Sequence, residues 1–94
     1  QPRINVLPSD VFGGAPDKAT HIGLRPEQII QGEGEDSFVQ RVEHLGDQTR
    51  LHLSFKSHDL ITVTDAHTQL KEGDVIQIHP ADPFFFDASG ARIS

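Results

Sequence analysis

Turn-forming residues interrupt this chain so often that no long helix fits between them. Eight glycines and six prolines are spread over 94 residues, and the stretches between them show short apolar–polar alternation instead of helical periodicity. Clusters of glycine and proline mark turns. Short alternating runs with a turn about every 8–12 residues are typical of a β-sandwich or barrel. The pattern therefore predicts an all-β fold.

Seven short strands and one helical turn account for the whole pattern. The helical turn is expected at Arg25–Ile29, because Pro26 suits the first helical position and Glu27 the first turn. Gly32 and Gly34 are expected to close this segment. A small, partly open OB-type barrel fits the length, as a single domain over residues 1–94. The strands are expected at residues 3–7, 20–24, 60–64, 75–79 and 84–86, and in the two arms of a hairpin within 37–55.

The hairpin within residues 37–55 has the clearest alternation. A turn at Gly46 and Asp47 would oppose three pairs of residues: Val42 and Leu51, Gln40 and Leu53, and Phe38 and Phe55. On one face this register sets Glu43 beside Arg50. The other face is buried, as a half-exposed sheet requires, and carries five apolar residues: Phe38, Val42, Leu51, Leu53 and Phe55.

Charge and composition argue against several classes of ligand. The net charge is −6 and no two Lys or Arg residues are adjacent, whereas binders of nucleic acid show a basic stripe. The chain has no cysteine, and its six histidines include no His-x-His pair that would indicate a zinc site. No run of about 18 apolar residues could span a bilayer. We expect no metal and no nucleic-acid partner.

Catalytic motifs are not found in the sequence either. The serines lie in no Gly-x-Ser-x-Gly turn, and there is no thiol nucleophile. Glu33, Glu35 and Asp36 stand beside glycines, in what we interpret as a solvated loop and not a buried acid–base pair. The phosphate-binding motif Gly-x-x-x-x-Gly-Lys-Ser/Thr does not occur. We therefore expect no enzyme activity, no ATP binding and no cofactor in this chain.

Five short phrases occur along the chain in a characteristic order. They are an Asn between apolar residues (Pro2, Ile4, Asn5, Leu7); Gly23-Leu24-Arg25-Pro26-Glu27; Val42-Glu43 with Leu45-Gly46; Gly73-Asp74; and Phe86-Asp87 with Gly90, Arg92 and Ile93. In this order they resemble the transport-associated OB (TOBE) domain, which follows the ATPase domain in ABC importers of the sugar-uptake class.

The resemblance implies a regulatory and dimerisation domain of an ABC transporter ATP-binding protein. The parent would use ATP and Mg to import a carbohydrate or related solute, at the cytoplasmic face of the cell membrane. Its partners would be its own ATPase domain, a second ATPase subunit in a homodimer, and the membrane subunits. Because the chain has no Met, we expect it to be a C-terminal piece of that parent. A second possibility is a module of the same superfamily that senses a small oxyanion or sugar.

The phrase residues are expected to be mainly structural. Gly46, Gly73 and Gly90 suit turns with positive φ, and the Asp87 side chain can cap the turn that contains Ser89. The residues that the resemblance singles out are Asn5, Gly23, Arg25, Pro26, Glu27, Glu43, Gly46, Gly73, Asp74, Phe86, Asp87 and Gly90.

Three consecutive phenylalanines close the last strand. Alternate side chains of a strand point to opposite faces, and the matched phrase sets Phe86 just before the turn. We therefore expect Phe84 and Phe86 to point inward and Phe85 outward. An outward Phe in so polar a chain indicates a contact with another domain or subunit, so Phe85 is the candidate interface residue. Alternatively, Pro80, Pro83 or the loop at 11–16 covers it within one domain.

Overall fold

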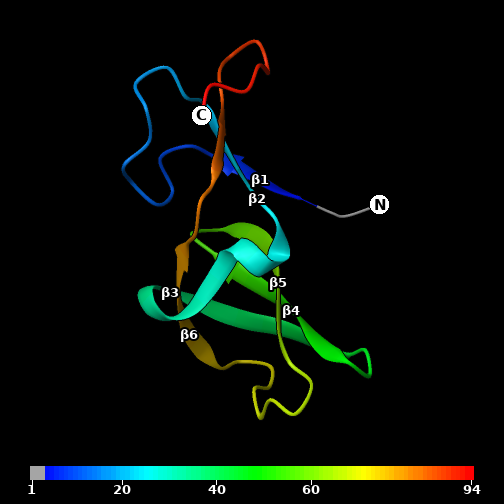
Figure 1. Ribbon diagram of the computed structural model, residues 1–94. Coiled ribbons are helices and arrows are strands. Elements are labelled where there is room, and N and C mark those ends of the chain that lie inside the picture. Colours follow the sequence, from blue (N-terminus) through cyan, green and yellow to red (C-terminus); the bar gives the residue numbers. More distant parts are fainter. Residues whose placement is uncertain (1–3) are drawn as a thin grey trace.

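Residues 4–94 are described by a computed structural model, in which the strands form two antiparallel sheets (Figure 1). The smaller sheet has the order β1-β2-β7, and the larger has the order β5-β4-β3-β6. A 3₁₀ turn, η1 (Pro26–Gln28), leads from the smaller sheet into the larger. The strands are β1 (Asn5–Pro8), β2 (His21–Leu24), β3 (Ile29–His44), β4 (Gln48–Phe55), β5 (His58–Asp65), β6 (Val75–Pro80) and β7 (Phe84–Phe86).

This architecture confirms the predicted small, OB-like all-β fold with seven strands and one short helical turn. The strands do not close into one hydrogen-bonded barrel, because β5 and β1 are not paired as strands. Within residues 4–94, no helix has the length and apolar character that a membrane crossing requires.

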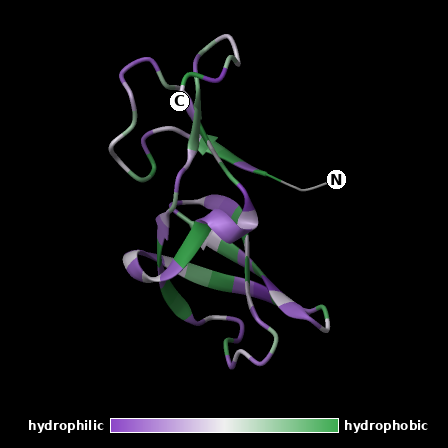
Figure 2. Ribbon diagram, viewed as in Figure 1, coloured by the Kyte–Doolittle hydropathy of each residue, from purple (hydrophilic) through white to green (hydrophobic). Residues whose placement is uncertain are grey.

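A single hydrophobic core receives side chains from both sheets. Figure 2 shows hydrophobic residues along the strands and mainly hydrophilic or neutral residues in the loops. The loop after β1 also contributes, because Val11 is buried and the Phe12 ring stacks on Phe55 with centroids 4.8 Å apart. Each such side chain contributes about 1.5–3 kcal/mol when fully buried. The members with at most 1% exposure are Ile22, Leu24, Leu51, Leu53, Phe55, Leu60 and Ile78.

Strand β3 is longer than the sequence predicted. Gly32 and Gly34 do not end the segment that follows η1, but lie within one continuous strand. The pairing with β6 shifts at this point, so that Ile78 is opposite both Gln31 and Glu35. Gly32 and Gly34 have φ of 119° and 122°, a conformation open mainly to glycine. Two glycines therefore form a bulge where we expected a loop, and Glu33, Glu35 and Asp36 are exposed on it.

The predicted register of the β3–β4 hairpin is correct near the turn and wrong beyond it. Val42 is opposite Leu51 as expected, but a bulge between Val39 and Arg41 places Phe38 opposite Ser54. One extra residue in a strand reverses the face to which the side chains beyond the bulge point. Phe38 is therefore 53% exposed, and Val39 takes the inward position at 2%. Leu51, Leu53 and Phe55 are buried as predicted.

The directions of the three phenylalanines are the reverse of the prediction. Phe85 is 9% exposed and belongs to the core, whereas Phe84 and Phe86 are half-buried on the outer face. In the smaller sheet Phe85 is directly opposite Ile22, which is in turn opposite Leu7. Residues opposite one another point to the same face, so these three form one inward row. The prediction of an outward Phe85 is therefore wrong, because this side chain lies in the core of the domain.

Candidate functional site

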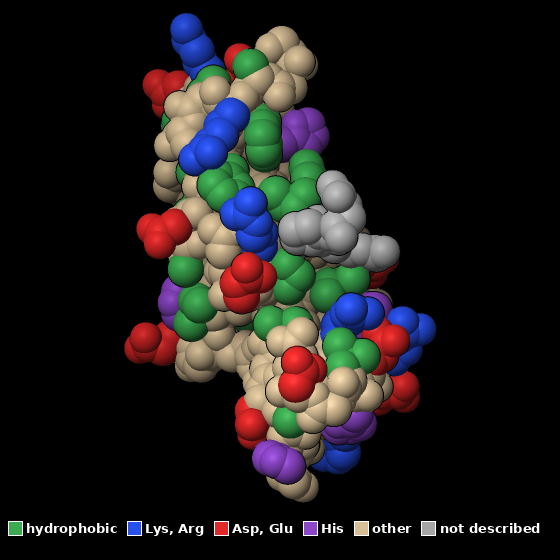
Figure 3. Space-filling model, turned by 45° about the vertical axis from the view of Figure 1, so that its right-hand side comes forward, with side chains coloured by type: hydrophobic (Ala, Val, Ile, Leu, Met, Phe, Trp, Pro, Cys, Tyr) green, Lys and Arg blue, Asp and Glu red, His purple; other side chains and the backbone are tan. Residues whose placement is uncertain are grey.

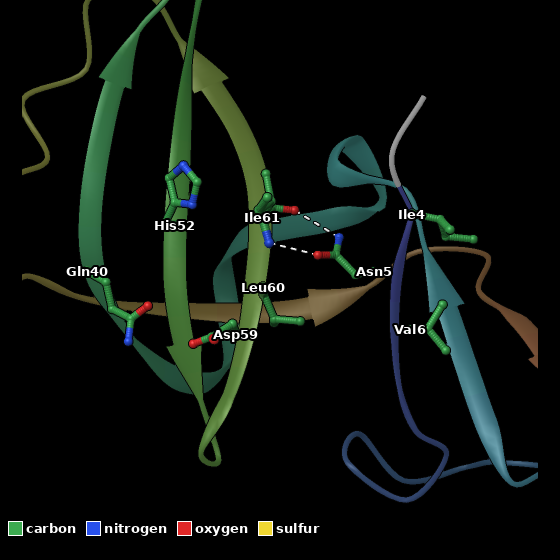
Figure 4. A pocket seen from close by; sticks show the side chains of 8 residues that line it. All are labelled: Ile4, Asn5, Val6, Gln40, His52, Asp59, Leu60 and Ile61. Atoms are coloured by element: carbon green, nitrogen blue, oxygen red, sulfur yellow. Dashed lines mark hydrogen bonds between the residues drawn. The ribbon is translucent and has the colours of Figure 1, made fainter. Parts of the chain in front are cut away.

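The Asn5 side chain joins the two sheets. Its Nδ2 donates to the carbonyl oxygens of Leu24 (3.0 Å) and Ile61 (2.9 Å), and its Oδ1 accepts from the Ile61 N–H (2.8 Å). Figure 4 shows the two bonds to Ile61. A carboxamide can donate and accept together, so it makes the pair of bonds that a neighbouring strand would make. Asn5 thereby fixes β1 to the edge strand β5.

Two further side chains connect β5 with η1 and the start of β3. The buried Thr62 hydroxyl lies 2.8 Å from the Pro26 carbonyl oxygen and 3.1 Å from that of Ile29. Farther along, Gln31 Nε2 donates to the Val63 carbonyl at 3.2 Å. Side chains thus satisfy backbone groups that sheet pairing leaves open. Thr62 has no recognisable signature in the sequence, because threonine is an ordinary residue within a strand pattern.

Replacing Asn5 by Ala is expected to lower the free energy of unfolding by about 1–3 kcal/mol, because buried groups of Leu24 and Ile61 lose their partner. Urea denaturation at neutral pH measures the change. Gln40→Ala is the control, since it removes an exposed carboxamide, and should change stability by about 0.5 kcal/mol or less. Equal effects of the two substitutions would contradict the bridging role of Asn5.

The phrase glycines lie in turns or at a close contact. Gly46, Gly73 and Gly90 have φ of 95°, 90° and 86°, the left-handed region that favours glycine. Gly23 is different, because a Cβ there would lie 2.9 Å from the Phe86 ring and 3.0 Å from the Ile4 side chain. A glycine at this position lets Phe86 of β7 and Ile4, just before β1, pack over β2.

The carboxylates of Asp87 and Asp74, which belong to two of the five phrases, stabilise turns. Asp87 Oδ1 accepts from the N–H and hydroxyl of Ser89 (2.9 and 2.6 Å) and from the Ala91 N–H (3.1 Å). The Ser89 hydroxyl, and next the Ala91 N–H, lower the pKa of Asp87. Asp74 accepts from the Lys71 N–H at 3.0 Å and pairs with its Nζ at 3.2 Å. The hydrogen bond from the Lys71 N–H lowers the pKa of Asp74.

The Arg25-Pro26-Glu27 phrase forms the start of η1. Pro26 is the first residue of the 3₁₀ turn, and the Arg25 N–H donates to Gln28 Oε1 at 2.7 Å. The Arg25 guanidinium carbon lies 5.1 Å from the centroid of the Phe84 ring. Glu27 is exposed and pairs with no Lys or Arg side chain in residues 4–94. The phrase therefore combines a strand end with an exposed cation on an aromatic ring.

Glu43 is the centre of a charged cluster on β3 and β4. Its Oε1 lies 2.5 Å from His52 Nε2, 3.4 Å from an Arg41 nitrogen and 3.5 Å from an Arg50 nitrogen. The predicted Glu43–Arg50 pair is thus confirmed. The hydrogen bond from His52 and the charge of Arg41 lower the pKa of Glu43. Partly exposed pairs of this kind contribute little to stability, and the cluster has no nucleophile.

A cleft of about 420 Å³ opens between β1 and the larger sheet. The polar side chains that line it from the larger sheet are Gln40, His52 and Asp59. In Figure 4 Asn5 points toward Ile61 of β5, whereas the side chains of Ile4 and Val6 point away from the larger sheet. The Asp59 carboxylate repels anions but can accept hydrogen bonds from hydroxyl groups. The cleft therefore fits a small hydroxylated molecule better than an oxyanion.

No group of three or more His, Asp or Glu side chains in the described part of the chain is arranged to hold a metal ion. The carboxylates of the β3 bulge are exposed, and Glu35 pairs with Lys56 Nζ at 2.8 Å. These carboxylates are exposed to solvent, as expected for a surface loop and not for a buried acid–base pair.

Comparison with known proteins gives two matches. The family model of the TOBE domain matches residues 22–86. The sn-glycerol-3-phosphate import ATP-binding protein UgpC 2 of Rhizobium johnstonii (strain DSM 114642 / LMG 32736 / 3841) is 32% identical over 90 residues, which cover 83% of this chain and 26% of that protein. The chain thus spans about a quarter of the length of this curated relative.

Proposed function

Because the chain belongs to the TOBE domain family, we propose that it is the regulatory domain of an ABC transporter ATP-binding subunit. The 32% identity to an import ATP-binding protein carries the proposal. The parent would couple ATP hydrolysis to the import of a carbohydrate, or of a related polyol or phosphorylated solute. It would work at the cytoplasmic face of the membrane, attached to the membrane subunits.

Within the parent, this domain would hold two ATPase subunits together while their nucleotide domains separate. A persistent contact keeps the effective concentration of the two subunits high when the ATP-dependent contact is broken. Phe38 and Val75 support such a contact. They are directly opposite each other on β3 and β6, and they are 53% and 52% exposed. Two uncharged apolar side chains can meet their own copies about a twofold axis.

Phe38→Ser is therefore expected to weaken self-association of the chain at least about tenfold, as measured by sedimentation equilibrium. The melting temperature should change little, because about half of the Phe38 side chain is already in water. Leu45→Ser is the control, since it removes another exposed apolar side chain (42%) at the far end of the hairpin. A wild-type chain that stays monomeric at millimolar concentration would contradict self-association through this surface.

We propose that this chain is not itself an enzyme, and that ATP and Mg bind to the ATPase domain of the parent. The absence of a phosphate-binding Gly-x-x-x-x-Gly-Lys-Ser/Thr motif from the sequence supports this. Calorimetric titration of the chain with millimolar Mg-ATP should give no binding heat beyond dilution. Saturable binding would contradict the proposal.

Recognition of a small ligand is a second candidate function, and the cleft beside β1 supports it. Calorimetry with a panel of sugars, molybdate and tungstate tests it. Saturable binding of a sugar that Asp59→Asn weakens would favour sensing of a hydroxylated solute. Binding of molybdate or tungstate would instead indicate an oxyanion sensor, and would contradict the expectation that the Asp59 carboxylate repels anions.

A further inference from the structure

The outer face of the smaller sheet carries an exposed apolar strip. Val6 on β1 is 54% exposed and Ile4 just before it is 39% exposed. Phe84 and Phe86 on β7 are half-buried on the same face, since β2 sets Gly23 opposite Val6 and Phe84. Figure 3 shows hydrophobic side chains gathered in the upper half of the molecule, with Lys and Arg side chains among them. We call Ile4, Val6, Phe84 and Phe86, together with Arg25 and Arg92, the β7 face.

Two arginines lie close to one ring of this face. The guanidinium carbons of Arg25 and Arg92 lie 5.1 and 4.3 Å from the centroid of Phe84. The electrons of an aromatic ring attract a guanidinium cation that lies over its face. The Phe84 ring therefore holds both cations beside the exposed apolar strip.

Arg25 and Arg92 differ from most of the other described basic residues in their electrostatic partners, although Lys18 also has no carboxylate partner. Four basic side chains elsewhere pair with carboxylates: Arg41, Arg50, Lys56 and Lys71. Neither Arg25 nor Arg92 forms an ion pair with an Asp or Glu side chain anywhere in residues 4–94, and Arg92 Nε donates to the backbone oxygen of Ser94 at 3.2 Å. In a chain with 14 acidic residues and a net charge of −6, this leaves two cations beside exposed apolar surface.

We propose that the β7 face binds a protein segment in which carboxylates flank an apolar side chain. The apolar side chain would cover Val6 and Phe86, next to a shallow hollow of about 350 Å³ that these two residues line with Ala88 and Gly90. The carboxylates would pair with Arg25 and Arg92, whose planar forks bind carboxylate oxygens two at a time. This contact differs from the Phe38–Val75 surface and does not depend on self-association.

Charge excludes two other occupants. A second copy that used the same face about a twofold axis would bring four guanidiniums together, and like charges oppose association. A nucleic acid needs a row of basic groups for its phosphates, whereas the β7 face as defined offers two, and it would leave Ile4 and Val6 without an apolar partner. His21 and Asp87 also line the hollow, and Asp87 Oδ1 accepts hydrogen bonds from its own turn. Because Asp87 stays negatively charged, the apolar side chain of the segment would lie at the hollow and its carboxylates at Arg25 and Arg92.

A phage-displayed library of random peptides tests the proposal, with the 94-residue chain as bait. Selected peptides are synthesised in two forms, one with Asp and Glu and one with Asn and Gln in their place. Calorimetry then measures their affinity for the wild type, for R25Q/R92Q and for the control R41Q/R50Q, which removes the same charge from the larger sheet. V6E is a further variant, because it places a carboxylate on an exposed residue of the face without removing either arginine.

We expect the selected peptides to combine carboxylates with Leu, Ile, Val or Phe. Their affinity should fall about tenfold or more in the amide form, with R25Q/R92Q and with V6E, and about twofold or less with R41Q/R50Q. Amide chemical shifts should change at Val6, Phe84 and Phe86. Three results would overturn the proposal: no peptide is selected, the selected peptides lack carboxylates, or R41Q/R50Q loses as much affinity as R25Q/R92Q.

Discussion

Leu53→Ala is expected to lower the free energy of unfolding by about 2–5 kcal/mol, a large share of the stability of a small domain. Leu53 is 0% exposed and lies at the centre of β4, opposite Val39 and Leu60, which are both buried. Truncation removes one methine and two methyl carbons and leaves a cavity that a rigid sheet cannot fill by collapse. Urea denaturation followed by circular dichroism measures the loss.

The matched control for this prediction is Leu45→Ala. Leu45 is 42% exposed, just after β3, so its truncation opens no cavity and should change stability by about 0.5 kcal/mol or less. A loss below about 1 kcal/mol for Leu53→Ala would place this side chain outside the core and contradict the β4 register.

Gly34→Ala is expected to destabilise the chain by about 3 kcal/mol or more, through two separate effects. The first is backbone strain, because φ is 122° and a side chain there costs about 1–3 kcal/mol. The second is a collision, because the new Cβ would lie 2.0 Å from the carbonyl oxygen of Ile78. That oxygen belongs to the paired backbone of β6 and cannot rotate away, so the bulge must open.

Gly32→Ala separates these effects. Gly32 has nearly the same backbone conformation, with φ of 119°, but a Cβ there would meet no heavy atom within 4 Å. Gly32→Ala should therefore lower the free energy of unfolding by the backbone strain alone, about 1–3 kcal/mol. The melting temperatures of the two variants, compared in one buffer, give the difference. Equal losses would show that β3 and β6 are farther apart at this bulge than the structure places them.

The five phrases contribute in different ways to the folded chain. Asn5 fixes the first strand to β5, Gly23 allows close packing, and Asp87 closes the last turn. Arg25 and Arg92, from the second and fifth phrases, instead meet on the Phe84 ring at the surface. A family pattern can thus combine residues that fold the chain with residues that leave donors free for a partner.

The sequence by itself determined the fold class, the helical turn and most of the turns. Local chemistry is sufficient for these features, since Pro26 sets the start of η1 and the glycines at 46, 73 and 90 allow positive φ without help from distant residues. The predicted Glu43–Arg50 neighbours depend only on the hairpin turn three residues away. Near a turn, register follows from the turn itself.

Only the tertiary structure decided which side chains face inward. Phe38 and Phe85 were assigned to the wrong faces because side chains alternate with a period of two, so that one unseen bulge or one unknown partner strand reverses the assignment. The bulge at Gln40 and the pairing of Phe85 with Ile22 depend on contacts across the whole chain. The convergence of Arg25 and Arg92 on Phe84 likewise arises only when β2 and β7 pair, because the two arginines are 67 positions apart in sequence.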